Sequence, residues 1–271
     1  MKKQFAFDVD GTLVNKQMQI LPGAAEFIGK IIDSINNVEI VITSGASLHE
    51  VELAIKLINQ NLGEEKFTPK IIAHGGAYIQ IDEKTKVENP LEPNELEELL
   101  RIVYNIDPHC AICFRTKEVN FYADKNLPEN IIKTMRSLPK SFNAVNNQKS
   151  LEFRDVKINS REIFGLEIIS AKNPTIYKML KERYEKEGFI VSFGTCIEIN
   201  KVGKVNALLK VYDDLKNVIY FGDGYNDIPC FRECGVSFGI GNNYEAIKYA
   251  THKIKTYYEA IEKFFEDDLS L

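Results

Sequence analysis

The stretch FAFDVDGTLV, residues 5–14, is an apolar run that ends in two aspartates, Asp8 and Asp10. Its aromatic and aliphatic residues predict a buried strand over residues 3–9, and the apolar spacing of residues 22–35 predicts a helix that follows it. Carboxylates at the end of a core strand repel each other and resist burial, so they require a partner of opposite charge. The stretch therefore marks the start of a fold and also a candidate site.

The alternation of strand and helix continues beyond this stretch and returns near the end of the chain. We expect further strands at residues 38–43, 70–73, 218–221 and 236–240, and helices at 48–61, 205–215, 228–233, 244–250 and 257–265. Strands separated by helices in this way pair in parallel and are covered by the helices. The pattern predicts an α/β fold with a doubly wound, Rossmann-like parallel sheet.

The middle of the chain mixes strands and helices without that regular alternation. We expect one helix from Pro93-Asn94 onward, helices at 127–138 and 174–187, and strands at 110–115, 119–122, 151–156, 163–170 and 189–199. We interpret this block as an inserted α+β domain with antiparallel strands. The predicted division is a core of residues 1–82 and 199–271 and a cap of residues 83–198.

The composition is that of a soluble globular protein, with 44% hydrophobic and 27% charged residues among 271. A net charge of -5 without a basic cluster argues against nucleic acid as a partner. No apolar run reaches the length of a membrane span, so we expect no membrane association and a cytoplasmic location. The five cysteines are an odd number, which argues against a disulfide framework. We expect a monomer or a weak dimer.

Polar clusters follow the predicted core strands. Asp8 and Asp10 follow the first strand, TSG at residues 43–45 follows the second, and GDGYND at 222–227 follows a later one. Ligands of parallel α/β sheets bind beyond the carboxyl ends of the strands, so four aspartates should converge on one rim. These four are Asp8, Asp10, Asp223 and Asp227. Oxygen ligands without a histidine nearby in sequence favour Mg²⁺.

A carboxylate can attack phosphorus and form an aspartyl-phosphate, but only where positive charge offsets the repulsion between two anions. Lys204 opens the helix predicted after the cap and could supply that charge from near a helix N-terminus. The hydroxyl of Ser44 and the backbone N–H groups around Gly11 and Gly45 are suited to phosphate oxygens. The sequence therefore contains the parts of a phosphoryl-transfer site.

Each of these residues also has a plainer interpretation. A simple turn would explain Asp10 and Ser44, and a helix cap would explain Asp227. A solvated side chain would explain Lys204, and Lys201 lies close enough in sequence to be its rival. The coincidence of all the motifs, rather than any single one, favours the site.

Together these motifs resemble those of the haloacid dehalogenase (HAD) superfamily of phosphohydrolases. The shared motifs are DVDGT at residues 8–12, TSG at 43–45, a lysine at 204 and GDGYND at 222–227. In detail the chain looks like the Cof-type subfamily, which carries a large α/β cap between the second and third motifs. HGGAYI at 74–79 and GVSFGIGNNYEAIKYAT at 235–251 are also similar to segments of that family.

The resemblance implies catalytic roles for four residues. Asp8 would be the nucleophile and a metal ligand. Asp10 would be the general acid and base, with its main-chain carbonyl on the metal. Lys204 would orient Asp8 and neutralise charge, and Ser44 would hold a phosphate oxygen.

The resemblance also implies a metal site and an activity. Asp223 would be the second carboxylate on Mg²⁺, Asp227 would support the water shell of the metal, and Asn226 would lie close to the phosphate. The implied enzyme is a Mg²⁺-dependent phosphatase of small phosphorylated metabolites, with sugar phosphates as the default substrate. A phosphomutase of hexose phosphates and a non-catalytic metabolite-binding protein are the alternatives.

The substrate itself is left open by a departure from the family pattern. Ser44-Gly45-Ala46 stands where many Cof-type proteins carry Thr-Gly-Arg, so a substrate contact from that arginine is missing. Specificity should then lie in the cap. Its polar candidates for a substrate contact, each with a solvated surface position as the alternative, are Arg115, Arg154, Lys172 and Asn173.

Overall fold

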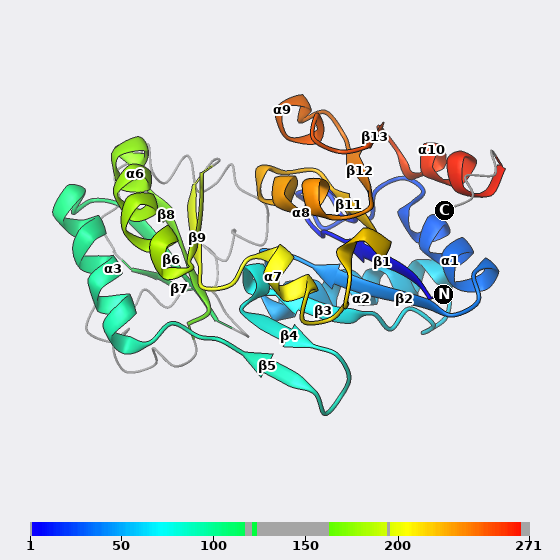
Figure 1. The fold of residues 1–271 in the computed structure, drawn as a ribbon, viewed down its shortest axis with the longest axis horizontal. Coiled ribbons are helices and arrows are strands. Elements are labelled where there is room, and N and C mark those ends of the chain that lie inside the picture. Colours follow the sequence, from blue (N-terminus) through cyan, green and yellow to red (C-terminus); the bar gives the residue numbers. More distant parts are fainter. Residues whose placement is uncertain (1, 117–120, 124–162, 194–195, 267–271) are drawn as a thin grey trace.

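Two β-sheets organise the chain. The computed structural model describes residues 2–116, 121–123, 163–193 and 196–266. Among these residues the strands form one sheet of eight and one sheet of five. Figure 1 shows the two sheets in separate parts of the molecule, each with helices of its own.

The eight-stranded sheet has the order β13-β12-β11-β1-β2-β3-β4-β5. Its strands are β1 (Lys3–Phe7), β2 (Val38–Thr43), β3 (Lys70–Ala73), β4 (Tyr78–Gln80), β5 (Lys86–Glu88), β11 (Val218–Gly222), β12 (Val236–Ile240) and β13 (His252–Ile254). From β13 to β3 the neighbours run parallel, whereas β4 and β5 are added antiparallel. The predicted parallel α/β sheet is confirmed, and the β4–β5 hairpin extends its edge.

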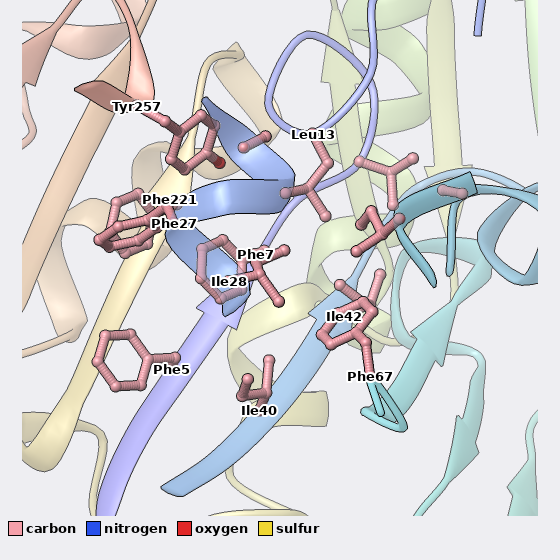
Figure 2. Close-up of a cluster of buried hydrophobic side chains, with 14 of the residues drawn as sticks. Phe5, Phe7, Leu13, Phe27, Ile28, Ile40, Ile42, Phe67, Phe221 and Tyr257 are labelled. Carbon is pink, nitrogen blue, oxygen red and sulfur yellow. The ribbon is translucent and has the colours of Figure 1, made fainter. Parts of the chain in front are cut away.

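Side chains of β1 alternate between two hydrophobic layers. Phe5 and Phe7 lie in the layer that includes residues of α1, α2 and α10, and Phe7 stacks on Phe221 with ring centroids 4.7 Å apart (Figure 2). Ala6 lies in the opposite layer with residues of α7 and α8. These helices are α1 (Ala24–Ser34), α2 (Leu48–Leu62), α7 (Lys204–Leu208), α8 (Ile228–Glu233) and α10 (Tyr257–Ile261). Burial on both faces fixes the register of β1 and hence the position of its carboxyl end.

The five-stranded sheet is antiparallel and has the order β7-β6-β8-β10-β9. Its strands are β6 (Ala111–Arg115), β7 (Phe121–Ala123), β8 (Gly165–Ile169), β9 (Ile190–Phe193) and β10 (Ile197–Asn200), and its helices are α3 (Pro93–Ile106) and α6 (Asn173–Tyr184). The single strand predicted over 189–199 is wrong, because β9 and β10 pair antiparallel with Val191 opposite Ile199. Both side chains enter one apolar cluster, so the chain folds back on itself to bury the two apolar runs together.

The two sheets correspond roughly to the predicted core and cap, but their strands do not define the domain boundaries. Strand β5 belongs to the eight-stranded sheet and ends at Glu88, whereas β10 belongs to the five-stranded sheet and ends at Asn200. The division at residues 83 and 198 stays a prediction.

Some predictions fall outside the described residues. They are the helix at 127–138, the strand at 151–156 and the candidate Arg154. Within the described ranges, no helix combines the length and apolarity needed to cross a bilayer.

Candidate active site

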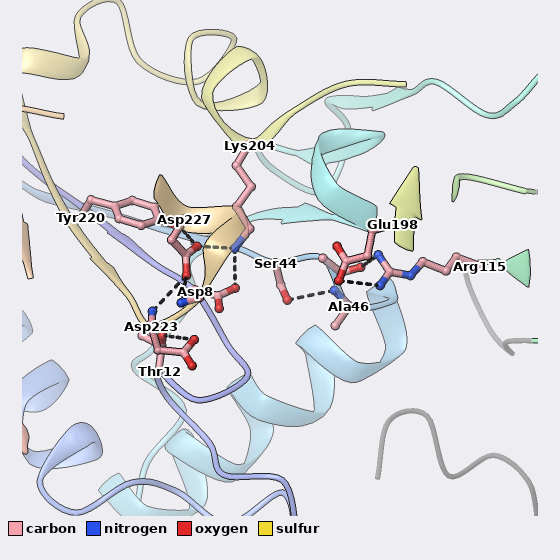
Figure 3. Close-up of polar contacts among 12 residues, drawn as sticks. Asp8, Thr12, Ser44, Ala46, Arg115, Glu198, Lys204, Tyr220, Asp223 and Asp227 are labelled. Carbon is pink, nitrogen blue, oxygen red and sulfur yellow. Dashed lines mark hydrogen bonds and ion pairs between the residues drawn. The ribbon is translucent and has the colours of Figure 1, made fainter. Parts of the chain in front are cut away.

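The carboxyl ends of β1 and β11 bring two aspartate motifs together. Asp8 follows β1 directly, and its backbone N–H donates to the carbonyl of Phe221 at 2.9 Å, which continues the parallel pairing of these strands. Asp223 follows β11, and the hydroxyl of Thr12 donates to Asp223 Oδ1 at 3.5 Å. Figure 3 shows Asp8 and Asp223 on the same rim of the sheet.

Lys204 is the buried cation of this rim. It opens α7, and its Nζ donates to Asp8 Oδ1 at 2.8 Å and to Asp227 Oδ1 at 2.7 Å. The side chain of Lys204 is 4% exposed, against 5% for Asp8 and 0% for Asp227. Burial alone would lower the pKa of Lys204, but the charges of Asp227 and Asp8 raise it above its usual value. The amine therefore stays protonated between the two carboxylates.

Asp227 has its hydrogen-bonding capacity filled by the protein. Its Oδ1 accepts from Lys204 and from the hydroxyl of Tyr220 at 2.5 Å. Its Oδ2 accepts from the backbone N–H groups of Asp223 at 3.0 Å and Gly224 at 2.9 Å. A carboxylate has about four acceptor positions, and these four contacts use them. Asp227 thus orders the loop of residues 222–227 and holds Lys204, which suits a supporting place behind a metal better than direct ligation.

The carboxylates of the rim fit a divalent cation. One oxygen each of Asp8, Asp223 and Asp227 lies within 4.8 Å of the others. Burial raises the pKa of Asp8 to about 7, with Lys204 opposing the rise and Asp227 adding to it. Burial, and then the charges of Asp227 and Asp8, raise the pKa of Asp223 well above its ordinary value. One lysine thus leaves an excess of buried negative charge, which a hard cation with oxygen ligands would offset.

Gly11 makes the turn that brings these groups together. Its φ of 78° lies in the left-handed region, and a Cβ at this position would lie 2.2 Å from Asp223 Oδ2. Its own N–H donates to the carbonyl of Val14 at 2.8 Å, within the turn. Gly11 therefore contributes through its backbone conformation and its lack of a side chain.

Asp10 lies two residues after Asp8 in the same turn but in a different environment. Burial raises the pKa of Asp10, and the charges of Arg115 and Lys204 partly offset the rise. Asp8, in contrast, accepts a hydrogen bond from Lys204. The pKa of both carboxyl groups is raised, so the hydrogen bond from Lys204 to Asp8, rather than the direction of the shift, distinguishes the two. A raised pKa holds a proton closer to neutral pH, which suits proton transfer to a leaving group.

The turn after β2 carries Ser44 to this rim. Ser44 Oγ accepts from the backbone N–H of Ala46 at 3.0 Å, so its hydroxyl hydrogen remains to be donated elsewhere. A Cβ placed on Gly45 would lie 3.4 Å from Arg115 Nη1 and 3.7 Å from Asn226 Nδ2. The structure therefore brings Asn226 next to the Ser44–Gly45 turn, together with an arginine from the second sheet.

Comparison with known protein families agrees with this arrangement. The family model of the haloacid dehalogenase-like hydrolases matches residues 5–262. The chain belongs to this family. The resemblance seen in its motifs is confirmed, and so is the prediction that the protein is an enzyme of the hydrolase class.

Solved structures resemble this HAD-like hydrolase over nearly its whole length. The HAD subclass IIB sugar phosphatase BT4131 has a TM-score of 0.73 at 17% identity, covering 97% of this chain and 98% of its own. A haloacid dehalogenase-like hydrolase from Bacteroides thetaiotaomicron has a TM-score of 0.71 at 20% identity, covering 98% and 100%. The HAD phosphatase BT1666 from the same organism has a TM-score of 0.70 at 17% identity, covering 97% and 95%. At these identities the similarity establishes the fold. A comparison with curated proteins gave no match.

Tyr220 is a member of the site in this HAD-like hydrolase that the motifs did not reveal. It lies within the apolar run of β11, where its hydroxyl donates to Asp227. The only signal in the sequence is a polar group inside a buried strand, two residues after Val218 and directly before Phe221. A buried tyrosine hydroxyl requires a partner, and the following acidic loop could have suggested one.

The described polar candidates of the cap lie in different surroundings. Arg115 donates to the carbonyl of Gly45 and so reaches the rim of the hydrolase. Lys172 Nζ instead donates to the carbonyl of Ile106 at 2.7 Å, and Asn173 Oδ1 accepts a backbone N–H at the start of α6 at 2.9 Å. Lys172 and Asn173 therefore make local contacts at the ends of α3 and α6, whereas Arg115 lies beside the candidate site.

Replacing Glu50 by glutamine should stabilise the hydrolase at alkaline pH. Glu50 Oε2 accepts from the backbone N–H of Ser47 at 2.7 Å in the capping box of α2. Burial raises the pKa of Glu50 to about 7, with the hydrogen bond from Ser47 opposing the rise and Asp10 adding to it. The unfolded chain loses this proton near pH 4.5, so stability falls as pH rises from there through 7.

Glu50→Gln cannot titrate and can still accept the bond from Ser47. We expect the free energy of unfolding to rise by about 1 kcal/mol at pH 8 and by little at pH 5. The value at pH 8 takes into account that Glu50 is partly exposed to solvent. Urea unfolding at the two pH values measures the gain, with the exposed neighbour Glu52→Gln as the control. An equal gain at pH 5 and pH 8 would contradict the role of ionisation.

Proposed function

We propose that this hydrolase is a Mg²⁺-dependent phosphatase that acts on small phosphorylated metabolites, sugar phosphates among them, through an aspartyl-phosphate. The observation that carries the proposal is the buried contact of Lys204 with Asp8, on a rim where the carboxylates outnumber the lysine. BT4131, which shares the fold, is a sugar phosphatase, and this supports the choice of substrate class.

In the proposed reaction, Asp8 attacks the phosphorus and the bond between phosphorus and the leaving oxygen breaks. Asp10 gives its proton to that oxygen, so the leaving group departs as an alcohol. Asp10 then takes a proton from a water molecule, which attacks the aspartyl-phosphate, releases inorganic phosphate and restores Asp8. Lys204 keeps Asp8 oriented and offsets negative charge during both steps.

The remaining residues bind the ion and the phosphate. Asp8, Asp223 and the main-chain carbonyl of Asp10 would hold Mg²⁺, which would neutralise charge on the phosphoryl group. Ser44 donates its hydroxyl to a phosphate oxygen, and Asn226 donates its amide beside it. Arg115 brings the second sheet to this rim, and we propose that the cap predicted over residues 83–198 excludes water from it. We propose a cytoplasmic monomer or weak dimer with small molecules as its partners.

Release of inorganic phosphate from a panel of phosphorylated metabolites tests the proposal. We expect turnover with Mg²⁺, a loss of at least about 100-fold after EDTA treatment, and recovery when Mg²⁺ is restored. Mg²⁺ should also raise the melting temperature, because it binds the folded carboxylate cluster. Phosphate release that persists without any divalent ion would overturn the mechanism. Formation of an isomeric phosphate in place of free phosphate would identify a mutase.

A further inference from the structure

The five-stranded sheet presents two chemically different faces. Apolar side chains such as Ile112, Leu166 and Ile197 pack into one cluster with residues of α3 and α6. Side chains alternate along strands, so the intervening residues face the other way. On that second face the sheet carries three charged residues from three adjacent strands, Arg115, Glu167 and Glu198.

These charges form a buried cluster at the boundary with the core. Glu167 and Glu198 are directly opposite each other across β8 and β10, a position in which like charges repel. Arg115 offsets the repulsion through an ion pair with Glu167, whose side chain is 2% exposed. Arg115 also donates to the carbonyl of Gly45 in the turn after β2. One guanidinium therefore ties the second sheet to the turn that carries Ser44.

Glu198 is the member of this cluster that remains available to a ligand. Its Oε1 makes a long ion pair with Arg115 Nη2 at 3.9 Å, without a hydrogen bond, and its side chain is 23% exposed. Its Oε2 would lie 3.7 Å from a Cβ placed on Gly45. Glu198 thus lies beside the turn whose Ser44 we propose to hold the phosphate, on the side that faces the second sheet.

We propose that Glu198 is the residue that selects the leaving group, by accepting hydrogen bonds from the hydroxyl groups of a neutral polyhydroxyl alcohol. Arg115 is a positioning residue that holds this carboxylate over the Ser44 turn. The assignment rests on the proposed phosphatase function.

The charge of the site decides which leaving groups fit. Among the described residues, the rim and the cluster contain six carboxyl groups against two cationic side chains, Lys204 and Arg115; the carboxyl groups belong to Asp8, Asp10, Asp223, Asp227, Glu167 and Glu198. A leaving group that carries its own carboxylate or phosphate would be repelled by Glu198, whereas hydroxyl groups would donate to it. We therefore expect monophosphates of neutral sugars and polyols as substrates.

The test compares three phosphate esters whose leaving groups differ. Glucose 6-phosphate has a neutral leaving group rich in hydroxyl groups. The leaving group of phenyl phosphate is neutral but has no further hydroxyl group, and that of 3-phosphoglycerate is anionic. Glu198→Ala should reduce the preference for glucose 6-phosphate over phenyl phosphate, as a ratio of kcat/KM, by roughly 10- to 100-fold. Glu198→Gln keeps a hydrogen-bond acceptor but removes the charge. It should therefore raise kcat/KM for 3-phosphoglycerate, relative to that for glucose 6-phosphate, by roughly tenfold.

Glu182→Ala is the matched control, since it removes a glutamate of the same cap whose side chain is 66% exposed. It should leave the ratios of kcat/KM among the three esters at the wild-type values. If the wild type hydrolyses the esters and both Glu198 variants keep its ratios, the assignment of Glu198 is overturned while the phosphatase function stands. If the wild type releases phosphate from none of a broad panel, the proposed function itself fails. Thermal melting confirms that each variant is folded.

Discussion

Asp8→Asn is expected to abolish phosphate release, with a loss of at least about 10⁴-fold in kcat, because the amide cannot attack phosphorus. The change is nearly isosteric, and the amide oxygen can still accept the hydrogen bond that Lys204 donates at 2.8 Å. The measurement is single-turnover and steady-state phosphate release with saturating Mg²⁺. Asp33→Asn, on the exposed surface of α1, is the control and should keep full activity.

A stability measurement shows whether Asp8→Asn loses activity because its chemistry is removed or because it unfolds. Burial raises the pKa of Asp8 to about 7, so the ionised form is less favourable in the folded protein than in the unfolded chain. The metal-free wild type therefore loses stability from this group as pH rises from about 4 to 7, and the asparagine variant does not. Asp8→Asn should melt at or above the wild-type temperature at pH 8 without Mg²⁺. Activity within tenfold of the wild type would show that Asp8 is not the nucleophile.

Lys204→Met should damage both stability and activity. The amine is the only cation within 4 Å of Asp8 and Asp227 among the ion pairs of the described residues, and its removal leaves two buried carboxylates without compensation. We expect a loss of about 3 to 5 kcal/mol in the free energy of unfolding at pH 8 and at least about 10²-fold in kcat. Part of the stability should return at pH 5, because the stranded carboxylates take up protons.

Lys201→Met is the matched control for this prediction, since sequence alone left Lys201 as the rival of Lys204. In the structure Lys201 Nζ pairs with Glu95 Oε2 at 3.0 Å, and its side chain is 30% exposed. A pair of this kind contributes at most about 1 kcal/mol. Urea unfolding at pH 5 and pH 8, together with phosphate release, compares the two variants. Equal losses for both would contradict the special position of Lys204.

The site was predictable where its residues follow strands of the parallel sheet. Asp8 and Asp223 come directly after β1 and β11, and parallel strands end at the same edge, so their meeting follows from topology. Lys204 was harder to assign, because its place depends on how α7 packs after the cap. Gly11 had a clear motif, but the reason for it, the carboxylate of Asp223 in the place of a Cβ, appears only in three dimensions.

Contacts between the two sheets could not be predicted in the same way. Arg115 reaches Gly45 although 70 residues separate them, and no spacing in the sequence specifies that approach. The β4–β5 hairpin was also missed, because Lys86–Glu88 is exposed at all three positions and shows no alternation of burial. Parallel core strands have strong apolar patterns since both faces are covered, whereas edge strands depend on pairing that composition does not reveal.

The central place of β1 has a consequence for synthesis of the chain. Its partner β2 emerges soon after it from the ribosome, but its other partner, β11, begins only at Val218. Until then one side of β1 lacks its backbone hydrogen bonds, and Phe7 lacks the ring of Phe221 that covers it. Nascent chains and truncated products that end before Val218 should therefore aggregate and need chaperones. The surroundings of Asp8 should be complete only after Val218–Gly222 has been made, so frameshifts and stop codons before that strand yield inactive, insoluble protein rather than partial activity.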